Sequence, residues 1–200
     1  MKPIINQHAL IQKCELKHDP IIVIVNSFTE DSANKFREEM SDAWSSGQPI
    51  VPVVIDSYGG QVDALVAMTD IVLSSRVPVA TFVSGKAMSC GAFLAAFGSK
   101  GHRYVAPNAR FMLHEVSAGT WGKIEEIKVD AAETERLNQW AFKMLDERCG
   151  KSAGYFLGKI HERNHADWFL TPAEALHHGF VDIVGSPTLR VNIDVKFNFG

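Results

Sequence analysis

The sequence predicts an α/β fold in which helices cover a mostly parallel sheet. Three times in succession, an apolar run rich in β-branched residues is followed by a turn and by a segment with helical periodicity. Repeated strand–turn–helix units imply right-handed crossovers between parallel strands. The chain has 200 residues, 46% of them hydrophobic, which is enough for one buried core. We therefore expect a single domain over residues 21–200, after an N-terminal segment over residues 1–20.

The first half of the chain supplies these three units. Ile21 to Val25 is a continuous β-branched run, typical of a strand that is buried on both faces. Thr29 can cap the helix that follows, and Gly47 ends it. The apolar positions of the second helix, from Val62 to Leu73, form a stripe that faces the core. Strands are expected over residues 21–25, 50–55 and 77–83. The helices that follow them are expected over residues 29–44, 62–73 and 88–97.

The order of elements changes after residue 100. Two short strands are expected at 103–105 and 110–115, with a turn between them. A long helical pattern then runs from Ile124 to Arg148 and is closed by Gly150. Such a helix is about 37 Å long at 1.5 Å per residue, more than a domain of this size needs. This length indicates a helix that projects or packs against a neighbouring subunit.

The C-terminal part reads as two further helices and one strand. A helix is expected over residues 152–163. Thr171 and Glu174 form a capping box, with a proline at the first helical position, and open a short helix that Gly179 ends. Residues 180–184 then return as a strand, and the last fifteen residues are expected to form a loosely attached tail.

Composition and charge exclude several function classes. The net charge of −3 predicts no nucleic-acid partner and no anionic membrane partner. Three cysteines without a C-x-x-C spacing argue against a disulfide framework and for a reducing compartment. The sequence shows no secretory signal and no apolar run long enough to span a membrane, so we expect a cytoplasmic protein. No Walker or dinucleotide glycine pattern is present, and no cofactor is expected.

Three separate segments fit together as one active site. Ser89 lies between small residues, after a strand pattern and at the start of a helix pattern. This position exposes the serine hydroxyl. It also leaves the N–H of Cys90 free to face a developing negative charge. His114 follows 25 residues later and interrupts an apolar strand, as a base for the serine would. The Gly59-Gly60 pair is either a tight turn or a backbone N–H held at an oxyanion. Together they predict a serine hydrolase, most simply a peptidase.

These segments resemble the ClpP family of self-compartmentalised serine peptidases, which has the ClpP/crotonase fold. Asp56-Ser57-Tyr58-Gly59-Gly60 is similar to the family pattern N-S-P-G-G, and residues 85–94 match G-x-A-x-S-x-G-A-F-L. Residues 107–114 match P-N-[SA]-x-x-M-[IL]-H. Residues 167–182 match D-x-F-[LM]-[ST]-x-x-E-A-x-x-x-G-[LF]-[IV]-D. The matches follow the family order and cover roughly residues 20–185, so the resemblance is specific.

The resemblance implies a role for each site residue. Ser89 would be the nucleophile, His114 the general base, and Asp167 the carboxylate that orients His114. The backbone N–H groups of Gly59 and Cys90 would form the oxyanion hole. Asp167 is selected by the resemblance alone, since an acid just before a helix is otherwise a surface residue.

The resemblance also implies an assembly. Residues 115–150 would form a handle of strand and helix. The subunits would form heptameric rings, single or stacked in pairs, that enclose a chamber. An AAA+ unfoldase would feed peptides or unfolded proteins to this chamber in ATP-dependent proteolysis. Tyr58 replaces the usual proline, and His165-Ala166 replaces an Asp-Arg pair that couples the catalytic acid to ring stacking. Residues 1–20 lack the family's axial loop, so docking of an unfoldase is not carried over. A divergent member of this kind could be virus-encoded.

Two other functions and one other site stay open at this point. A crotonase-type enzyme would use paired backbone N–H groups on an acyl-CoA and need no serine, and a non-catalytic ring subunit would dock an active partner. His161 and His165 lie four residues apart, as zinc ligands on a helix do. Because no third ligand is evident in the sequence, a solvated helix face is the favoured interpretation and no metal is expected.

Overall fold

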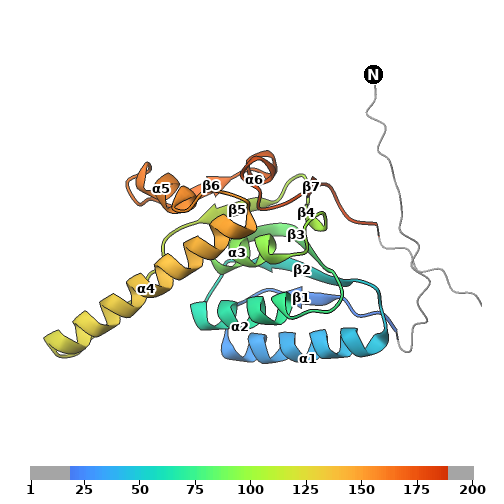
Figure 1. Cartoon of the computed structure of the whole chain (residues 1–200), viewed down its shortest axis with the longest axis horizontal. Helices are drawn as coiled ribbons and strands as arrows, with labels where there is room; N and C mark the ends of the chain where they lie inside the picture. The colour runs from blue at the N-terminus through green and yellow to red at the C-terminus, as the bar shows by residue number, and fades with distance from the viewer. Residues whose placement is uncertain (1–18, 189–200) are drawn as a thin grey trace, which may run out of the picture.

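A seven-stranded, mostly parallel sheet forms the centre of the molecule (Figure 1). The computed structural model describes residues 19–188 of the chain. Five strands follow the order β1-β2-β3-β4-β7, while β5 pairs with β3 and β6 pairs with β5. Only the β5–β6 pair is antiparallel. The strands are β1 (Val23–Val25), β2 (Val51–Ser57), β3 (Val79–Met88), β4 (Arg103–Val105), β5 (Arg110–Leu113), β6 (Trp168–Leu170) and β7 (Ile183–Val184).

Six helices surround this sheet in the described residues. They are α1 (Glu30–Ser46), α2 (Val62–Leu73), α3 (Cys90–Phe97), α4 (Ile124–Arg148), α5 (Tyr155–His161) and α6 (Pro172–His178). Helices α1 and α2 lie side by side along one face, whereas α5, β6 and α6 gather at the opposite side of the molecule (Figure 1). This arrangement confirms the predicted α/β fold.

Local capping signals set several helix ends as predicted. The Thr29 hydroxyl accepts a hydrogen bond from the Ser32 amide at 3.1 Å, and the Ser32 hydroxyl accepts one from the Thr29 amide at 2.8 Å. Gly47 ends α1 in the left-handed conformation with φ of 80°. The bounds of α2 and α4 are those predicted, and the Thr171 capping box and Gly179 enclose α6.

Two burial predictions from the sequence are wrong. β1 is an edge strand, and its residues alternate between core and solvent, so that Ile24 is 55% exposed. A continuous β-branched run therefore does not mean burial on both faces here, because no helix covers the outer face. In α2, Leu65 and Thr69 are buried as expected, but Leu73 is exposed at the helix end and Met68 takes the central core position.

The third strand ends five residues later than the sequence suggested, and the third helix begins two residues later. β3 continues past residue 83 to Met88, passing through Gly85 with φ of 100°. Helix α3 then begins at Cys90 rather than at 88, and every one of its residues is buried. The apolar helix thereby fixes the end of β3 at the centre of the sheet, with Ser89 as the single residue between strand and helix.

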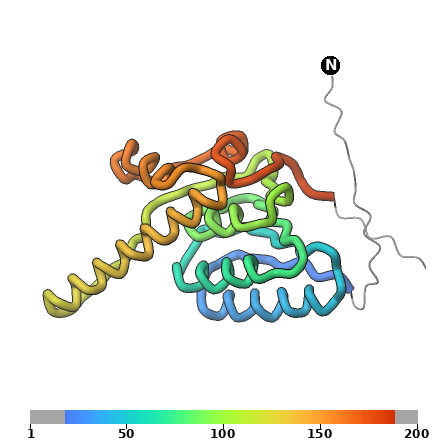
Figure 2. The backbone as a smooth tube through the Cα atoms, in the orientation of Figure 1, coloured from blue at the N-terminus to red at the C-terminus, as the bar shows by residue number. Residues whose placement is uncertain are grey.

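The handle region is only partly as expected. Helix α4 matches the predicted range and extends away from the rest of the chain (Figure 2). Residues 114–123, in contrast, form no strand in the described structure. A strand needs a neighbouring strand to pair with, and none runs beside this segment within residues 19–188. The described helices include none that is both long and apolar enough to cross a bilayer.

The C-terminal elements are shorter than predicted, and one was missed. α5 covers 155–161 instead of 152–163, β7 covers 183–184 instead of 180–184, and the strand β6 was not expected. Arg103 of β4 anchors this region through a 2.5 Å ion pair with Asp182. The expected segment at 1–20 and the expected tail fall largely outside the described residues.

Candidate active site

Ser89 lies in a strained turn between β3 and α3. Its φ of 52° and ψ of −124° belong to a conformation that costs a non-glycine residue about 1–3 kcal/mol and that concentrates at functional sites. The Ser89 amide donates a 2.8 Å hydrogen bond to the carbonyl of Met112 in β5, which holds the turn in place. The sequence therefore forms a rigid strand-to-helix corner with the serine at its tip.

His114 reaches Ser89 from the neighbouring strand. β5 runs parallel to β3, with Met112 beside Met88, so both strands end at the same edge of the sheet. His114 follows directly after β5, and its Nε2 atom lies 2.9 Å from the Oγ atom of Ser89. The structure thus brings together the two side chains that the sequence proposed as nucleophile and base.

Asp167 directly precedes β6, and its side chain makes no hydrogen bond to His114 in the described structure. In the antiparallel β5–β6 pair, Leu113 faces Trp168, and one further step in this register places His114 opposite Asp167. Directly opposite residues in such pairs have Cβ atoms about 4.5–5.5 Å apart. The Asp167 side chain is exposed, and no hydrogen bond within residues 19–188 joins it to His114. The structure therefore brings Asp167 near the end of β5 without joining its carboxylate to His114.

The Gly59 turn packs directly against the serine. Gly59 has φ of 103°, and a Cβ atom there would lie 2.7 Å from the Cβ of Ser89 and 3.2 Å from the amide nitrogen of Cys90. Only glycine fits this position. The Gly59 amide donates to the hydroxyl of the buried Ser57 at 3.0 Å. Among the described residues, the amides of Gly60 and Cys90 donate no hydrogen bond, so within the predicted Gly59-Gly60 pair it is Gly60 whose N–H is free.

The Cys90 thiol takes no part in this constellation. Its Sγ atom donates to the carbonyl of Gly60 at 3.2 Å, and burial raises the pKa of the thiol despite that hydrogen bond. A buried, protonated thiol is a poor nucleophile. The Cys90 side chain is therefore a packing residue and not a candidate nucleophile.

A charged cluster lies on the Gly59 turn next to the serine. The Lys86 ammonium lies 2.7 Å from a carboxylate oxygen of Asp56 and 4.3 Å from the centre of the Tyr58 ring. Tyr58 is 71% exposed. The residue that replaces the usual proline thus presents an aromatic face at the rim of the site.

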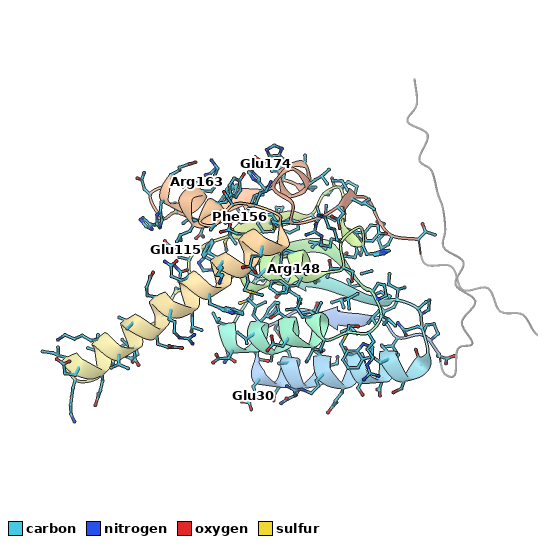
Figure 3. The ribbon with its side chains drawn as sticks, in the orientation of Figure 1. Glu30, Glu115, Arg148, Phe156, Arg163 and Glu174 are labelled. Carbon is cyan, nitrogen blue, oxygen red and sulfur yellow. The ribbon has the colours of Figure 1, made fainter. Side chains whose placement is uncertain are left out.

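A second polar cluster includes the residue that follows His114 in the sequence. Glu115, the residue after His114, is positioned between α4 and the α5 side of the molecule (Figure 3). Its carboxylate lies 2.6 Å from Nδ1 of His165 and 3.7 Å from Nε2 of His161. Burial alone would raise the pKa of Glu115, but hydrogen bonds from His165 and Asn138 outweigh it and lower the pKa. Sequence reasoning found the histidines and missed this third group, because Glu115 lies 46 residues before His161 and on another element.

Comparison with protein-family models gives one description of this chain. The model of the family described as Clp protease matches residues 6–188. The match covers nearly the whole chain and includes every residue of the site described above.

Proposed function

The chain belongs to the Clp protease family, and on this basis we propose that it is a self-compartmentalised serine endopeptidase that cleaves peptides or unfolded proteins. The observation that supports this most strongly is the 2.9 Å separation between Oγ of Ser89 and Nε2 of His114 at a strained turn. A serine hydroxyl is a weak nucleophile unless a base within hydrogen-bond reach removes its proton. The arrangement supplies that base.

The proposed reaction passes through an acyl-enzyme. His114 accepts the proton of Ser89 as Oγ attacks the carbonyl carbon of the scissile peptide bond, and it then gives the proton to the leaving amine. A water molecule, deprotonated by His114, attacks the ester and releases the acid and the free serine. We assign Asp167 to hold the imidazole tautomer, with its carboxylate reaching Nδ1 of His114 across the β5–β6 pair.

Backbone amides would stabilise the oxyanion of the tetrahedral intermediate. The amides of Gly59 and Cys90 are the proposed donors, because both lie against Ser89. For Gly59, the oxyanion would replace the hydroxyl of Ser57 as acceptor. The free amide of Gly60 is available beside them as a further donor. Removing one donor of this kind costs about 10²–10³ in kcat in other hydrolases.

An oligomeric ring is the proposed state of the active protein. Apolar side chains are exposed along the start of α4 and just before it, where Trp121 is 95% exposed and Ile124 and Val129 are also open to solvent. Clustered exposed apolar side chains mark protein contacts. We propose that this region packs against another subunit, in a single or double ring, in the cytoplasm. Delivery of substrate by an AAA+ unfoldase is what the family resemblance implies, but its docking is not carried over, because residues 1–20 lack the family's axial loop.

Casein digestion combined with light scattering tests this function. We expect an assembly whose mass is a multiple of 22.1 kDa and which degrades casein. Ser89→Ala should keep the mass and lose activity by several orders of magnitude. Ser117→Ala, which removes an exposed serine of the handle, is the matched control and should keep both. Full casein degradation by Ser89→Ala would contradict the serine mechanism, whereas an assembled wild type that degrades no casein would favour an acyl-CoA enzyme or a scaffold subunit.

A further inference from the structure

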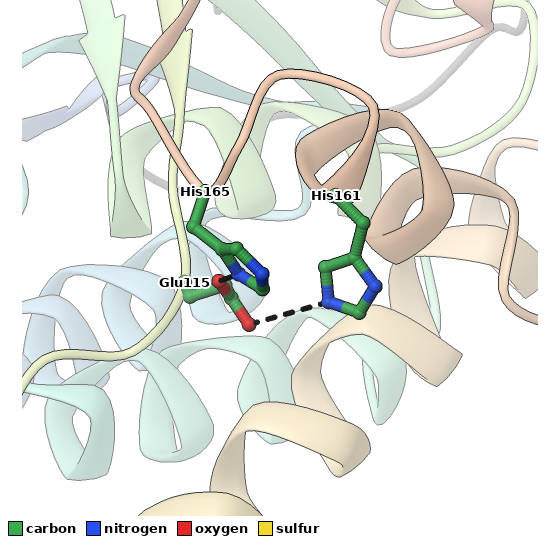
Figure 4. Close-up of side chains that lie close together, drawn as sticks. All are labelled: Glu115, His161 and His165. Carbon is green, nitrogen blue, oxygen red and sulfur yellow. Dashed lines mark hydrogen bonds and ion pairs between the residues drawn. The ribbon is translucent and has the colours of Figure 1, made fainter.

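One carboxylate and two imidazoles converge beside the active site. Glu115, His161 and His165 each offer one ligand atom, and these atoms all lie within 4.8 Å of one another (Figure 4). His161 ends α5 and His165 lies in the loop after it, and the centres of their rings are 4.5 Å apart. Glu115 comes from the segment that follows β5. Three ligands from two separate segments thus surround one point.

This set of groups matches the ligands of a transition-metal ion. Two imidazoles and one carboxylate form the zinc sites of several hydrolases, with a fourth position left for water. Ligand bonds to zinc are about 2.0–2.2 Å, so neighbouring ligand atoms in a tetrahedral site are about 3.4 Å apart. Oε2 of Glu115 lies 2.6 Å from Nδ1 of His165, and Oε1 lies 3.7 Å from Nε2 of His161, one distance on either side of that value.

The surroundings hold these ligands in place. The amide of Asn138, a buried residue of α4, donates to Oε1 of Glu115 at 3.2 Å, and the Asn138 side-chain oxygen accepts from the amide of Val116 at 3.0 Å. Outer groups of this kind orient the carboxylates that bind metals. Asn164 and His165 both have positive φ, at 55° and 62°, which turns the His165 ring back toward Glu115. Within the described residues, Glu115 is the only side chain that pairs with the ring nitrogens of His161 and His165.

We propose that Glu115, His161 and His165 bind one divalent transition-metal ion, with Zn²⁺ as the best fit. His161 is 49% and His165 60% exposed at the side chain, so an ion can enter from solvent. The borderline-soft Zn²⁺ accepts both imidazole and carboxylate ligands without a demand for octahedral geometry.

The ion would join the two segments that carry the proposed catalytic residues. Glu115 directly follows His114, and His165 lies two residues before Asp167. An ion that ties these segments together would hold Asp167 in register opposite His114. This consequence rests on the proposed function, whereas the binding site itself does not.

Titration of the metal-free, full-length protein with Zn²⁺ tests the site. Calorimetry should give one ion per chain, and Co²⁺ should give the visible absorption of a low-symmetry site. Glu115→Gln and His161→Ala should each weaken Zn²⁺ binding at least 10-fold, and Asn138→Ala about 10–100-fold. His165→Asn should weaken it equally, with asparagine chosen because it tolerates positive φ.

His177→Ala is the matched control, since His177 lies on α6 and is not one of the three clustered residues. It should leave binding unchanged. Absence of saturable binding at one ion per chain, or equal affinity in wild type and the ligand variants, would overturn the proposed site.

A labelling experiment separates the site from its consequence. Zn²⁺ should raise the rate at which a fluorophosphonate labels Ser89 in the wild type and leave the rate in His165→Asn unchanged. If Zn²⁺ binds but the labelling rates stay the same, the coupling to Asp167 is wrong while the metal site stands. If no labelling occurs with or without Zn²⁺, the proposed peptidase function fails, and the binding titration still decides the metal site.

Discussion

Replacing Gly59 by alanine tests the contact between the proposed oxyanion turn and the nucleophile. The new Cβ would lie 2.7 Å from the Cβ of Ser89, whereas carbon atoms in contact lie about 3.5–4.0 Å apart. The two segments must therefore separate by about 1 Å, and a misplacement of that size can cost about 10²-fold in rate. The positive φ of Gly59 adds a conformational penalty of about 1–3 kcal/mol. We expect Gly59→Ala to fold with a lowered melting temperature and to hydrolyse a fluorogenic peptide about 100-fold more slowly.

Gly101→Ala separates the steric effect from the backbone effect. Gly101 has φ of 85°, but no atom lies within 4 Å of the Cβ that alanine would add. This variant should therefore show a comparable stability loss in thermal denaturation while its rate of peptide hydrolysis stays at the wild-type value. Wild-type hydrolysis by Gly59→Ala, or an equal loss of hydrolysis in Gly101→Ala, would refute the proposed packing of this turn against Ser89.

Three other substitutions test separate parts of the structure. Asp167→Asn should fold normally, because the side chain is exposed, and should lower kcat by up to about 10⁴-fold in peptide hydrolysis through the wrong His114 tautomer; unchanged kcat would remove Asp167 from the triad. Burial opposes ionisation of Asp182, but the hydrogen bonds and charge of Arg103 outweigh burial and lower the pKa of the Asp182 carboxyl. The ion pair therefore stabilises the fold at neutral pH, and this contribution is lost as the pH falls. Asp182→Asn should cost about 3–5 kcal/mol in urea unfolding at pH 7, and the gap to wild type should narrow on acidification from about pH 5 downward; a gap independent of pH would contradict this. Trp121→Ser should reduce the mass found by light scattering while the chain still folds, because this side chain makes little contact within its own chain. An unchanged mass would exclude Trp121 from the subunit contact.

Signals confined to neighbouring residues made much of the fold predictable. The ends of α1 and α6 follow from hydroxyl caps at Thr29 and Thr171 and from left-handed glycines, and these act within one helical turn. The corner at Ser89 was visible for the same reason, because small residues between an apolar strand and an apolar helix permit only a sharp turn there. His114 could be paired with Ser89 because parallel strands end at a common edge.

Features that depend on distant partners were not predictable in this way. β6 has three residues and exists because β5 offers it an edge, so no periodicity in its own sequence reveals it. The exposure of Ile24 depends on which face the helices cover, which a β-branched run does not specify. The choice of Asp167 among the acids required the family resemblance, and the approach of Glu115 to His165 required coordinates.

The central claim is that the hydroxyl of Ser89 is a nucleophile activated by His114. Incubation of the assembled protein with a fluorophosphonate, followed by digestion and mass spectrometry, tests it most directly. The account predicts a single adduct on the peptide that contains Ser89, which is lost in His114→Ala and in protein unfolded by urea. An unlabelled Ser89 in the assembled protein, or labelling that persists without His114, would contradict the claim.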